Sequence, residues 1–186
     1  MLRPLVSSAP DRDVRSLILR PADSREVSRL QEIDKAARSR YRSAGPLSFA
    51  AETPAISSSR LIEGDVIVAE EDGRAVGFVL MNAMDGMLYI ANISVDPPFA
   101  GRGIGAALIE AAERHARSRG LTALALATFR TPRWNRPWFR QLGFQPMPAD
   151  QIGPSLRAVL TRHRKFLDMR TRITMWRPIC TERASG

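Results

Sequence analysis

A glycine-rich loop that opens directly into a helix is the strongest constraint on the fold of this chain. Residues 93–120 read ISVDPPFAGRGIGAALIEAAERHARSRG, which is a β-branched strand end, a Pro-Pro turn, alternating glycines and then a helical pattern. Gly101, Gly103 and Gly105 let the backbone approach a ligand closely, because no Cβ stands in the way. The first amides of the helix have no intrahelical partner and lie at its positive end. A phosphate or pyrophosphate is therefore the expected occupant of the loop.

The helix after the loop is predicted to be amphipathic and to end near Gly120, a typical C-terminal cap. Relative to Ile104, one side carries the apolar residues Ala107, Leu108, Ala111 and Ala112. Charged residues occupy the other side. His115 lies on the apolar stripe, so we interpret it as a packed side chain rather than a catalyst.

Three kinds of glycine loop are compatible with a strand–loop–helix unit. A Walker-type loop needs Lys-Ser or Lys-Thr after its last glycine, and Ala106-Ala107 stands there instead. A dinucleotide-binding loop needs an acidic residue about 20 positions later. No Asp or Glu occurs between Ala116 and Asp150, so that interpretation fails. The third kind is the pyrophosphate loop of acyl-CoA-dependent N-acyltransferases.

From about residue 14 to residue 178 the chain resembles that family, the GNAT superfamily. Matching features are the strand end Val95-Asp96-Pro97, the Gly103-Ile104-Gly105 loop, the following strand LTALALATF and a short helix that closes with Gly143-Phe144. The segment RTPRWNRPWFRQLGF, a later helix and the closing strand RITMWRP resemble one bacterial branch of the superfamily.

The resemblance implies an α/β (α+β) fold with a single GNAT-like domain. Its central sheet is expected to be mixed and mostly antiparallel, with about six to seven strands and flanking helices. We expect a loose N-terminal arm at 1–13, the domain at 14–178 and a C-terminal tail at 179–186. The closing strand RITMWRP is able to pair within the sheet or across a dimer, so a monomer and a homodimer both remain open.

Local patterns predict the remaining elements. VRSLILRPA (14–22) reads as a first strand, and DVIVAEEDG and RAVGFVLMNAMDG read as a strand pair around a turn at 71–73, followed by the central strand MLYIANISVDP. Asp23 with Glu26 resembles a capping box for a helix whose buried face runs from Val27 to Tyr41. Residues 42–64 are predicted to be a weakly ordered helix-loop region, where this family often builds its acceptor pocket. A last amphipathic helix is expected over Leu156–Leu167, with His163 packed.

Composition indicates a small soluble enzyme. The 186 residues suffice for one domain, and the single cysteine, Cys180, excludes an internal disulfide framework. No signal-peptide pattern or membrane span is visible, so we expect a cytoplasmic protein without a membrane partner. The net charge of +9 comes from dispersed arginines, since Lys35 and Lys165 are the only lysines. We therefore expect no nucleic-acid partner, and no metal site.

The resemblance further implies acetyl-CoA (coenzyme A) as co-substrate. The family's cofactor-binding positions fall here on Ile93, Ser94, Val95, Ala100, Gly101, Arg102, Gly103, Ile104, Gly105, Ala106, Asn135 and Phe139. The catalytic positions fall on Asn92, Ser94 and Phe139. The strand amides at 93–95 correspond to those that stabilise an oxyanion in the family.

Several of these positions depart from the family pattern. Asn92 stands where a glutamate usually acts as base, Phe139 where a tyrosine acts as acid, and Ala100 where the loop prefers Gln or Arg. Asn92 cannot act as a base, although its carbonyl is able to hold a water. General acid and base groups usually contribute about 10²–10⁴-fold, so their absence would slow the transfer of an acyl group without abolishing it.

Two functions from different classes therefore remain. One is an N-acetyltransferase that joins acetyl-CoA and an amine in a ternary complex, by positioning and with assistance from Tyr89 or Glu70. The other is an acyl-CoA-binding protein with weak or no catalysis. We expect Tyr41, Tyr89 and Trp134 to pack in the core or the pocket wall. The acceptor, a small-molecule or peptide amine, cannot be identified from the sequence.

Overall fold

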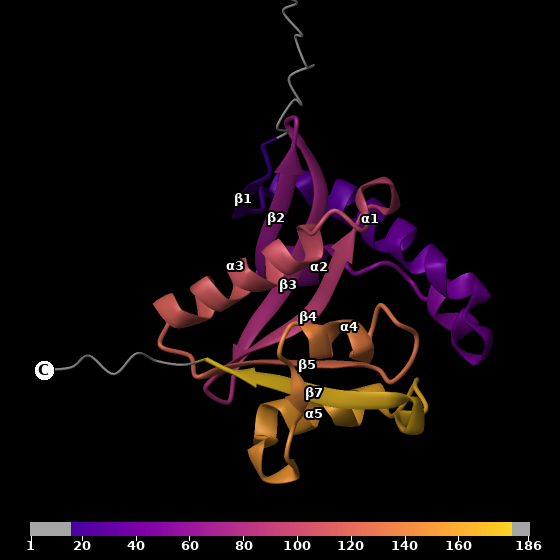
Figure 1. Ribbon diagram of the computed structural model, residues 1–186, viewed down its shortest axis with the longest axis vertical. Helices are drawn as coiled ribbons and strands as arrows, with labels where there is room; N and C mark the ends of the chain where they lie inside the picture. The colour runs from indigo at the N-terminus through magenta and orange to yellow at the C-terminus, as the bar shows by residue number, and fades with distance from the viewer. Residues whose placement is uncertain (1–15, 180–186) are drawn as a thin grey trace, which may run out of the picture.

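The computed structural model describes residues 16–179 and contains one seven-stranded sheet in the order β1-β2-β3-β4-β5-β7-β6 (Figure 1). The predicted arm at 1–13, Cys180 and most of the predicted tail lie outside the described residues. The strands are β1 (Ile18–Pro21), β2 (Asp65–Glu71), β3 (Arg74–Met84), β4 (Met87–Val95), β5 (Ala123–Phe129), β6 (Gln145–Pro146) and β7 (Arg172–Pro178).

The helices cover both faces of this sheet (Figure 1). They are α1 (Val27–Arg38), α2 (Ser58–Glu63), α3 (Ile104–Ser118), α4 (Arg136–Gln141) and α5 (Pro154–His163). The residues of α3 pack against the centre of the sheet on one side, together with Phe139 of α4. On the other side α1 and α2 cover β2 and β3, and Leu156 of α5 packs against β4 and β5.

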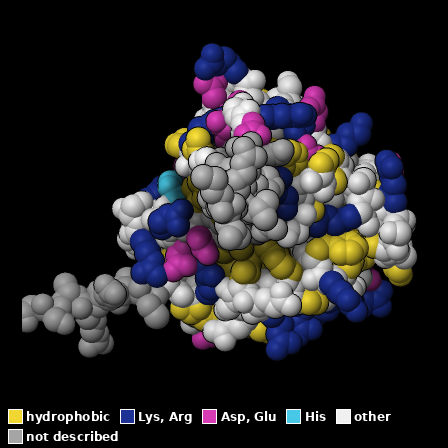
Figure 2. Space-filling view, turned by 45° about the horizontal axis from the view of Figure 1, so that its top comes forward, with side chains coloured by type: hydrophobic (Ala, Val, Ile, Leu, Met, Phe, Trp, Pro, Cys, Tyr) yellow, Lys and Arg dark blue, Asp and Glu magenta, His cyan; other side chains and the backbone are white. Residues whose placement is uncertain are grey.

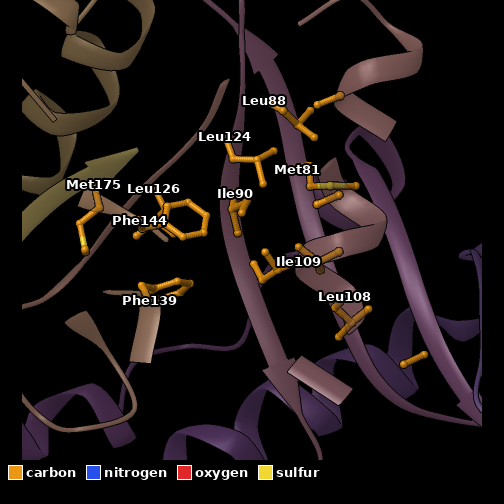
Figure 3. Packing of buried hydrophobic residues seen from close by; sticks show 14 of the residues in the cluster. Met81, Leu88, Ile90, Leu108, Ile109, Leu124, Leu126, Phe139, Phe144 and Met175 are labelled. Carbon is orange, nitrogen blue, oxygen red and sulfur yellow. The ribbon is translucent and has the colours of Figure 1, made fainter. Parts of the chain in front are cut away.

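The largest core lies between α3, α4 and the middle of the sheet. Ile109 of α3 lies beside Ile90 of β4 (Figure 3), and Leu108 and Leu88 belong to the same core. Each of these four side chains is at most 4% exposed, and fully burying a side chain of this size stabilises the fold by roughly 1.5–3 kcal/mol. This core fixes the first turns of α3 against β4.

One strand pair differs from the rest and creates the main opening in the sheet. All neighbouring strands are antiparallel except β4 and β5, whose parallel register ends at Ile90 and Leu126. Immediately afterwards β4 carries a β-bulge, since Leu80 of β3 is opposite Asn92 and Met81 is opposite Ile90, which leaves Ala91 unpaired. The edge of β4 that faces β5 is therefore free of strand partners after residue 90.

Most elements predicted from local patterns are confirmed. The capping box of Asp23 and Glu26 is present, and the strand pair turns at Asp72-Gly73 with positive φ at both residues. The closing strand lies within the sheet, between β5 and β6, rather than at an edge. β6 was missed by the sequence analysis, because two residues carry no periodic signal.

Three boundaries were predicted wrongly. The first strand is shorter than VRSLILRPA among the described residues, because only Ile18–Pro21 pair with β2. Tyr41 does not extend α1, which ends at Arg38 and continues as the 3-10 helix Ser39–Ser43. Leu167 lies beyond α5, which ends at His163. In each case the apolar spacing in the sequence continues beyond the last residue of the element, because apolar residues outside the element also pack.

The segment predicted to be weakly ordered, 42–64, has regular structure. It contains the end of the 3-10 helix Ser39–Ser43, a further 3-10 helix at Gly45–Ala51, and α2. Leu47 and Ala50 pack with Phe129 in a small core of their own. This segment therefore forms a fixed wall near the end of β5.

The charged side chains of the described part of the chain are dispersed over its surface. Arg and Lys side chains are spread over the face in Figure 2 rather than gathered in one patch. Between residues 16 and 179 no helix is long and apolar enough to cross a membrane. No group of three or more metal-ligating side chains occurs in the same residues.

Candidate active site

The glycine loop has the backbone conformation that glycine permits. Gly101 and Gly103 have φ values of +78° and +82°, a region that strains other residues. Gly103 is the residue before α3, and the first helical hydrogen bond of α3 runs from the Ala107 amide to the Gly103 carbonyl. The amides of Ile104, Gly105 and Ala106 precede that bond, so they are available to an anion at the positive end of the helix.

Gly105 is required for a different reason. A Cβ at this position would lie 3.0 Å from the indole of Trp138, closer than side chains normally pack. By contrast, a Cβ at Gly101 or Gly103 would meet nothing within 4 Å. The space above these two glycines is thus open to a ligand, whereas Gly105 lets α4 approach α3.

A cavity of about 630 Å³ extends from this loop through the opening between β4 and β5. On the α3 side it is lined by the loop, by Ile104 and by Trp138 and Phe139 of α4. On the opposite side of the sheet it is lined by Ala37, Arg38, Arg40, Tyr41, Phe49, Ala50 and Thr53, and at the sheet itself by the end of β5, residues 126–129. The cavity therefore connects the two faces of the sheet.

The predicted cofactor positions lie along this cavity. Its lining includes Ile93, Ser94, Val95, Ala100, Gly101, Gly103, Ile104, Gly105, Ala106, Asn135 and Phe139. Arg102 is not among the lining residues, because its guanidinium turns to Glu71 at 2.6 Å and lies over the Phe99 ring. The expected contribution of Arg102 to the site is thus limited to its backbone.

Asn92 and Ser94 belong to a buried polar network that ends at a carboxylate of α1. The Ser94 hydroxyl donates to the side-chain carbonyl of Asn92 at 2.9 Å, and the Asn92 amide donates to Asp34 at 3.2 Å. Asp34 is 2% exposed, pairs with Arg38 at 3.0 Å and also accepts from the Ile56 amide. The sequence analysis missed Asp34, because an acid on the buried face of a helix resembles an interruption of the apolar pattern.

Phe139 is an apolar part of the cavity wall. Its ring is 5% exposed and contacts Trp138 and Phe144, with ring centroids 4.8 and 5.5 Å apart. Figure 3 shows it beside Phe144, at the border of the large core. Phe139 thus brings no hydroxyl to the cavity.

Asn135 connects the two sides of the site. Its side-chain carbonyl accepts a hydrogen bond from the Tyr41 hydroxyl at 2.8 Å, and its amide donates to Thr128 at 2.9 Å. Tyr41, Thr128 and Trp134 all line the cavity, and the ring of Tyr41 packs edge-on against Trp134. Pocket-wall packing of Tyr41 and Trp134 was among the expectations, but the link across 94 positions has no signal in the sequence.

Neither of the residues suggested to assist catalysis lines the cavity. Tyr89 is 5% exposed within the core beneath α5, where burial raises the pKa of its phenol. The carboxylate of Glu70 pairs with Arg20 at 2.6 Å, between β2 and β1. Assistance from Tyr89 or Glu70 is therefore ruled out by their positions in the fold.

The two histidines also lie outside the cavity lining. Burial and the nearby Arg172 lower the pKa of His163 to about 4, so its ring is neutral near pH 7. His115 lies 3.4 Å from Asp65 at the surface of α3 and is only partly covered, so its expected packing is incomplete.

Comparison with known proteins agrees with this fold. The family model described as "Acetyltransferase (GNAT) family" matches residues 30–144, which is more than half of the chain. The chain therefore belongs to the GNAT acetyltransferase family.

Curated relatives match only in part. An amino-acid acetyltransferase of Pseudomonas syringae pv. syringae is 36% identical over 76 residues, which are 41% of this chain and 16% of that protein. An L-2,4-diaminobutyric acid acetyltransferase of Nocardia farcinica is 41% identical over 64 residues, 33% of each protein. The chain thus spans between a sixth and a third of the length of these two relatives.

Solved structures resemble nearly the whole chain. The paiA N-acetyltransferase of Thermoplasma acidophilum, in complex with coenzyme A, has a TM-score of 0.68 at 13% identity and covers 88% of this chain and 99% of its own. The N-acetylglutamate synthase of Neisseria gonorrhoeae, complexed with coenzyme A and N-acetyl-glutamate, has a TM-score of 0.69 at 20% identity, covering 89% of this chain and 36% of its own. At these identities the similarity establishes the fold, a single GNAT-like α/β domain.

Proposed function

We propose that this protein transfers an acetyl group from acetyl-CoA to the amine of a small acceptor by direct attack in a ternary complex. The observation that carries the proposal is the continuous cavity from the loop, through the opening between β4 and β5, to the opposite face of the sheet. A donor that enters along α3 and an acceptor that enters beside Tyr41 would meet in that opening. Membership of the GNAT family and the names of the relatives support the same reaction.

The residues of the α3 side fit coenzyme A. The amides of Ile104, Gly105 and Ala106 have no intrahelical partner, and the positive φ of Gly103 keeps them exposed to the loop. They would hold the pyrophosphate. The edge of β4 that has no strand partner after Ile90 offers backbone groups to the amides of an extended pantetheine chain, with Phe139 as an apolar wall.

Acetyl-CoA, when bound, supplies an acetyl group that is already activated as a thioester. The transfer forms a C–N bond and breaks the C–S bond, and the amine gives up a proton as the thiol leaves. Backbone amides at 93–95 would donate to the carbonyl oxygen as its negative charge grows. Holding the two reactants in contact is able to remove about 7–11 kcal/mol of the barrier, which is the largest contribution we assign to this site.

Acid–base assistance is weak in this proposal. None of the residues that line the cavity is an Asp or a Glu, so no carboxylate of the described chain reaches a bound amine directly. The network from Ser94 through Asn92 to Asp34 orients the Asn92 carbonyl, which keeps one lone pair for a water. The phenol among the lining residues, that of Tyr41, donates its hydrogen to Asn135 on the acceptor side, so we assign no side-chain acid to the leaving thiol.

The second candidate function is acyl-CoA binding without efficient transfer. The specific observation that favours it is the pair Asn92 and Phe139, which replaces both acid–base groups that the family commonly uses. Such a protein would keep the donor side of the cavity and use it for sensing or for interaction with other proteins.

Two measurements test these functions. At a hundredfold excess over its dissociation constant, a ligand that binds only the folded state stabilises it by about 2.7 kcal/mol, so acetyl-CoA should raise the melting temperature clearly and NAD or ATP much less. Thiol release with a panel of amines then separates an enzyme from a binding protein. A larger thermal shift with NAD than with acetyl-CoA would contradict both functions.

A further inference from the structure

The acceptor side of the cavity carries positive charge. Among its lining residues the charged side chains are Arg38, Arg40 and Arg172, and none is Asp, Glu or Lys. The three arginines come from the end of α1, from the 3-10 helix that follows it and from the start of β7. None belongs to the glycine loop, so the phosphates of a bound coenzyme A have their own partners elsewhere.

Arg38 is neutralised within the protein. Its guanidinium forms an ion pair with the buried Asp34 at 3.0 Å, and it also donates to the carbonyls of Thr53 and Pro54. With these partners Arg38 joins α1 to the loop at Thr53 and Pro54, after the 3-10 helix Gly45–Ala51, and it has little capacity left for a ligand.

Arg172 has no such partner in the described chain. One Nη donates to the Ala127 carbonyl at 2.7 Å, and the guanidinium stacks 4.6 Å from the centre of the Phe129 ring. Its Nε is buried and has no acceptor among residues 16–179, and no described carboxylate forms an ion pair with it. Burial also lowers the pKa of Arg172. Because a partly buried cation is stabilised by a neighbouring negative charge, the Arg172 guanidinium favours an anionic group of a ligand in this part of the cavity.

Arg40 lies at the opposite end of a row of aromatic rings. Its guanidinium is 5.8 Å from the centre of the Trp134 ring, and its Nε donates to the Ala37 carbonyl at 2.8 Å. The rings of Trp134, Tyr41 and Phe129 follow in edge-to-face contact, with centroids 5.8 and 5.6 Å apart. Two arginines without a described counter-charge therefore flank an aromatic wall of the acceptor side.

We propose that the acceptor is a small amine that carries a carboxylate, and that Arg172 binds this carboxylate with Arg40 at the rim. The inference rests on the proposed function and adds the class of its acceptor. A planar guanidinium matches the two oxygens of a carboxylate, and stacking on Phe129 fixes its plane. The same two positive charges disfavour polyamines and other amines that lack an acid.

The first test compares amines that differ only by the carboxylate. Initial rates with acetyl-CoA are measured for L-amino acids, including L-2,4-diaminobutyrate, and for the amines that remain when the α-carboxylate is removed, such as 1,3-diaminopropane. We expect kcat/KM to be at least about tenfold higher for the acid of the preferred pair. O-phosphoethanolamine is included as a phosphate-bearing probe. Equal rates within every pair, or a preference for the phosphate, would overturn the proposal.

Substitutions at Arg172 test whether this side chain causes the preference for a carboxylate. Arg172→Gln should lower kcat/KM for the preferred acid about thirtyfold or more, mostly through KM, and leave its decarboxylated partner and the affinity for acetyl-CoA nearly unchanged. Arg172→Lys, which keeps the charge, should lose less and serves if the first variant does not fold. Arg170→Gln is the matched control, since Arg170 is exposed and pairs with Asp168 two positions earlier. Equal losses for acid and amine would refute the role of Arg172.

A binding measurement separates this proposal from the proposed function. The protein saturated with coenzyme A is titrated with the same pairs in a calorimeter, so no turnover is needed. Binding of an acid but not of its decarboxylated partner, lost in Arg172→Gln, supports the carboxylate site even if no acetyl transfer occurs. Equal binding within the pairs, or no binding of any acid at millimolar concentration, would contradict it even if some other amine is acetylated.

Discussion

The side-chain amide of Asn92 donates a hydrogen bond to the buried carboxylate of Asp34 over 3.2 Å. This contact joins the central strand to α1 beside the opening between β4 and β5. It also orients the Asn92 carbonyl toward Ser94, so the Asn92 side chain is held by two protein partners.

Replacing Asn92 with alanine should impair both stability and turnover. Asp34 would lose a donor and Ser94 an acceptor, and an unsatisfied buried group costs about 1–3 kcal/mol. We expect Asn92→Ala to lower the free energy of unfolding by that amount in urea titrations and to reduce kcat, with unchanged affinity for acetyl-CoA. Asn82→Ala, in β3 and outside the cavity lining, is the control. Parent-like turnover and stability in Asn92→Ala would show that the network has no role.

Gly103→Val should abolish acetyl-CoA binding while the fold survives. A side chain at φ +82° costs roughly 1–2 kcal/mol, and relief of that strain would move the amides of the first turn of α3. Gly73→Val is matched, because Gly73 has φ +72° and open space but lies in the turn between β2 and β3. Calorimetry should show lost affinity only for the Gly103 variant. Unchanged affinity in a folded Gly103→Val would remove the loop from the donor site.

Phe139→Tyr should leave turnover unchanged or raise it. The ring lines the cavity, so an added hydroxyl is able to reach the side from which the thiol leaves. Phe144→Tyr is the control, since Phe144 is 2% exposed in the core and does not line the cavity. Its hydroxyl would be buried without a partner and should lower the melting temperature instead. A fall in kcat for Phe139→Tyr at unchanged acetyl-CoA affinity would argue against this placement of the thiol.

The free energy of unfolding should decrease as the pH is lowered, in part because of His163. Its pKa in the folded protein is lowered to about 4, whereas an unfolded histidine titrates near 6.5. The unfolded chain thus takes up the proton first as the pH falls, and the native state loses this stability between about pH 6.5 and 4. We expect His163 to lower the free energy of unfolding by roughly 1–2 kcal/mol between pH 7 and pH 4.5. This figure is reduced to allow for solvent screening, because the ring is partly exposed. His163→Gln should show a correspondingly smaller loss in urea titrations, and an identical pH dependence would disprove the effect.

The donor side of the site was predictable from the sequence because it is local. The positions from Ile93 to Ala106 are consecutive, and their chemistry depends on backbone amides that glycine exposes. Six of the seven strands followed from local patterns, and the family resemblance implied a sheet of about six to seven strands, whereas β6 was missed. Sequence patterns of this kind describe contacts between neighbours along the chain.

The acceptor side was not predictable, because its contacts are long-range. Arg172 begins a strand of otherwise ordinary composition, and only the fold brings it to Phe129. Tyr41 continues the apolar spacing of α1, yet its hydroxyl finds Asn135 because the helix ends three residues earlier. The role of Asp34 likewise depends on Asn92, a residue 58 positions away.

The sheet separates two sides of the molecule, and the opening beyond the parallel pair β4 and β5 connects them. Each reactant would approach from its own compartment, and the two chambers are built from separate stretches of chain. Substitutions in the segment 39–53 and at Arg172 would therefore change the preferred acceptor without changing the binding of acetyl-CoA. With this architecture the residues that contact the acceptor are able to change during evolution while the residues that would bind acetyl-CoA stay the same.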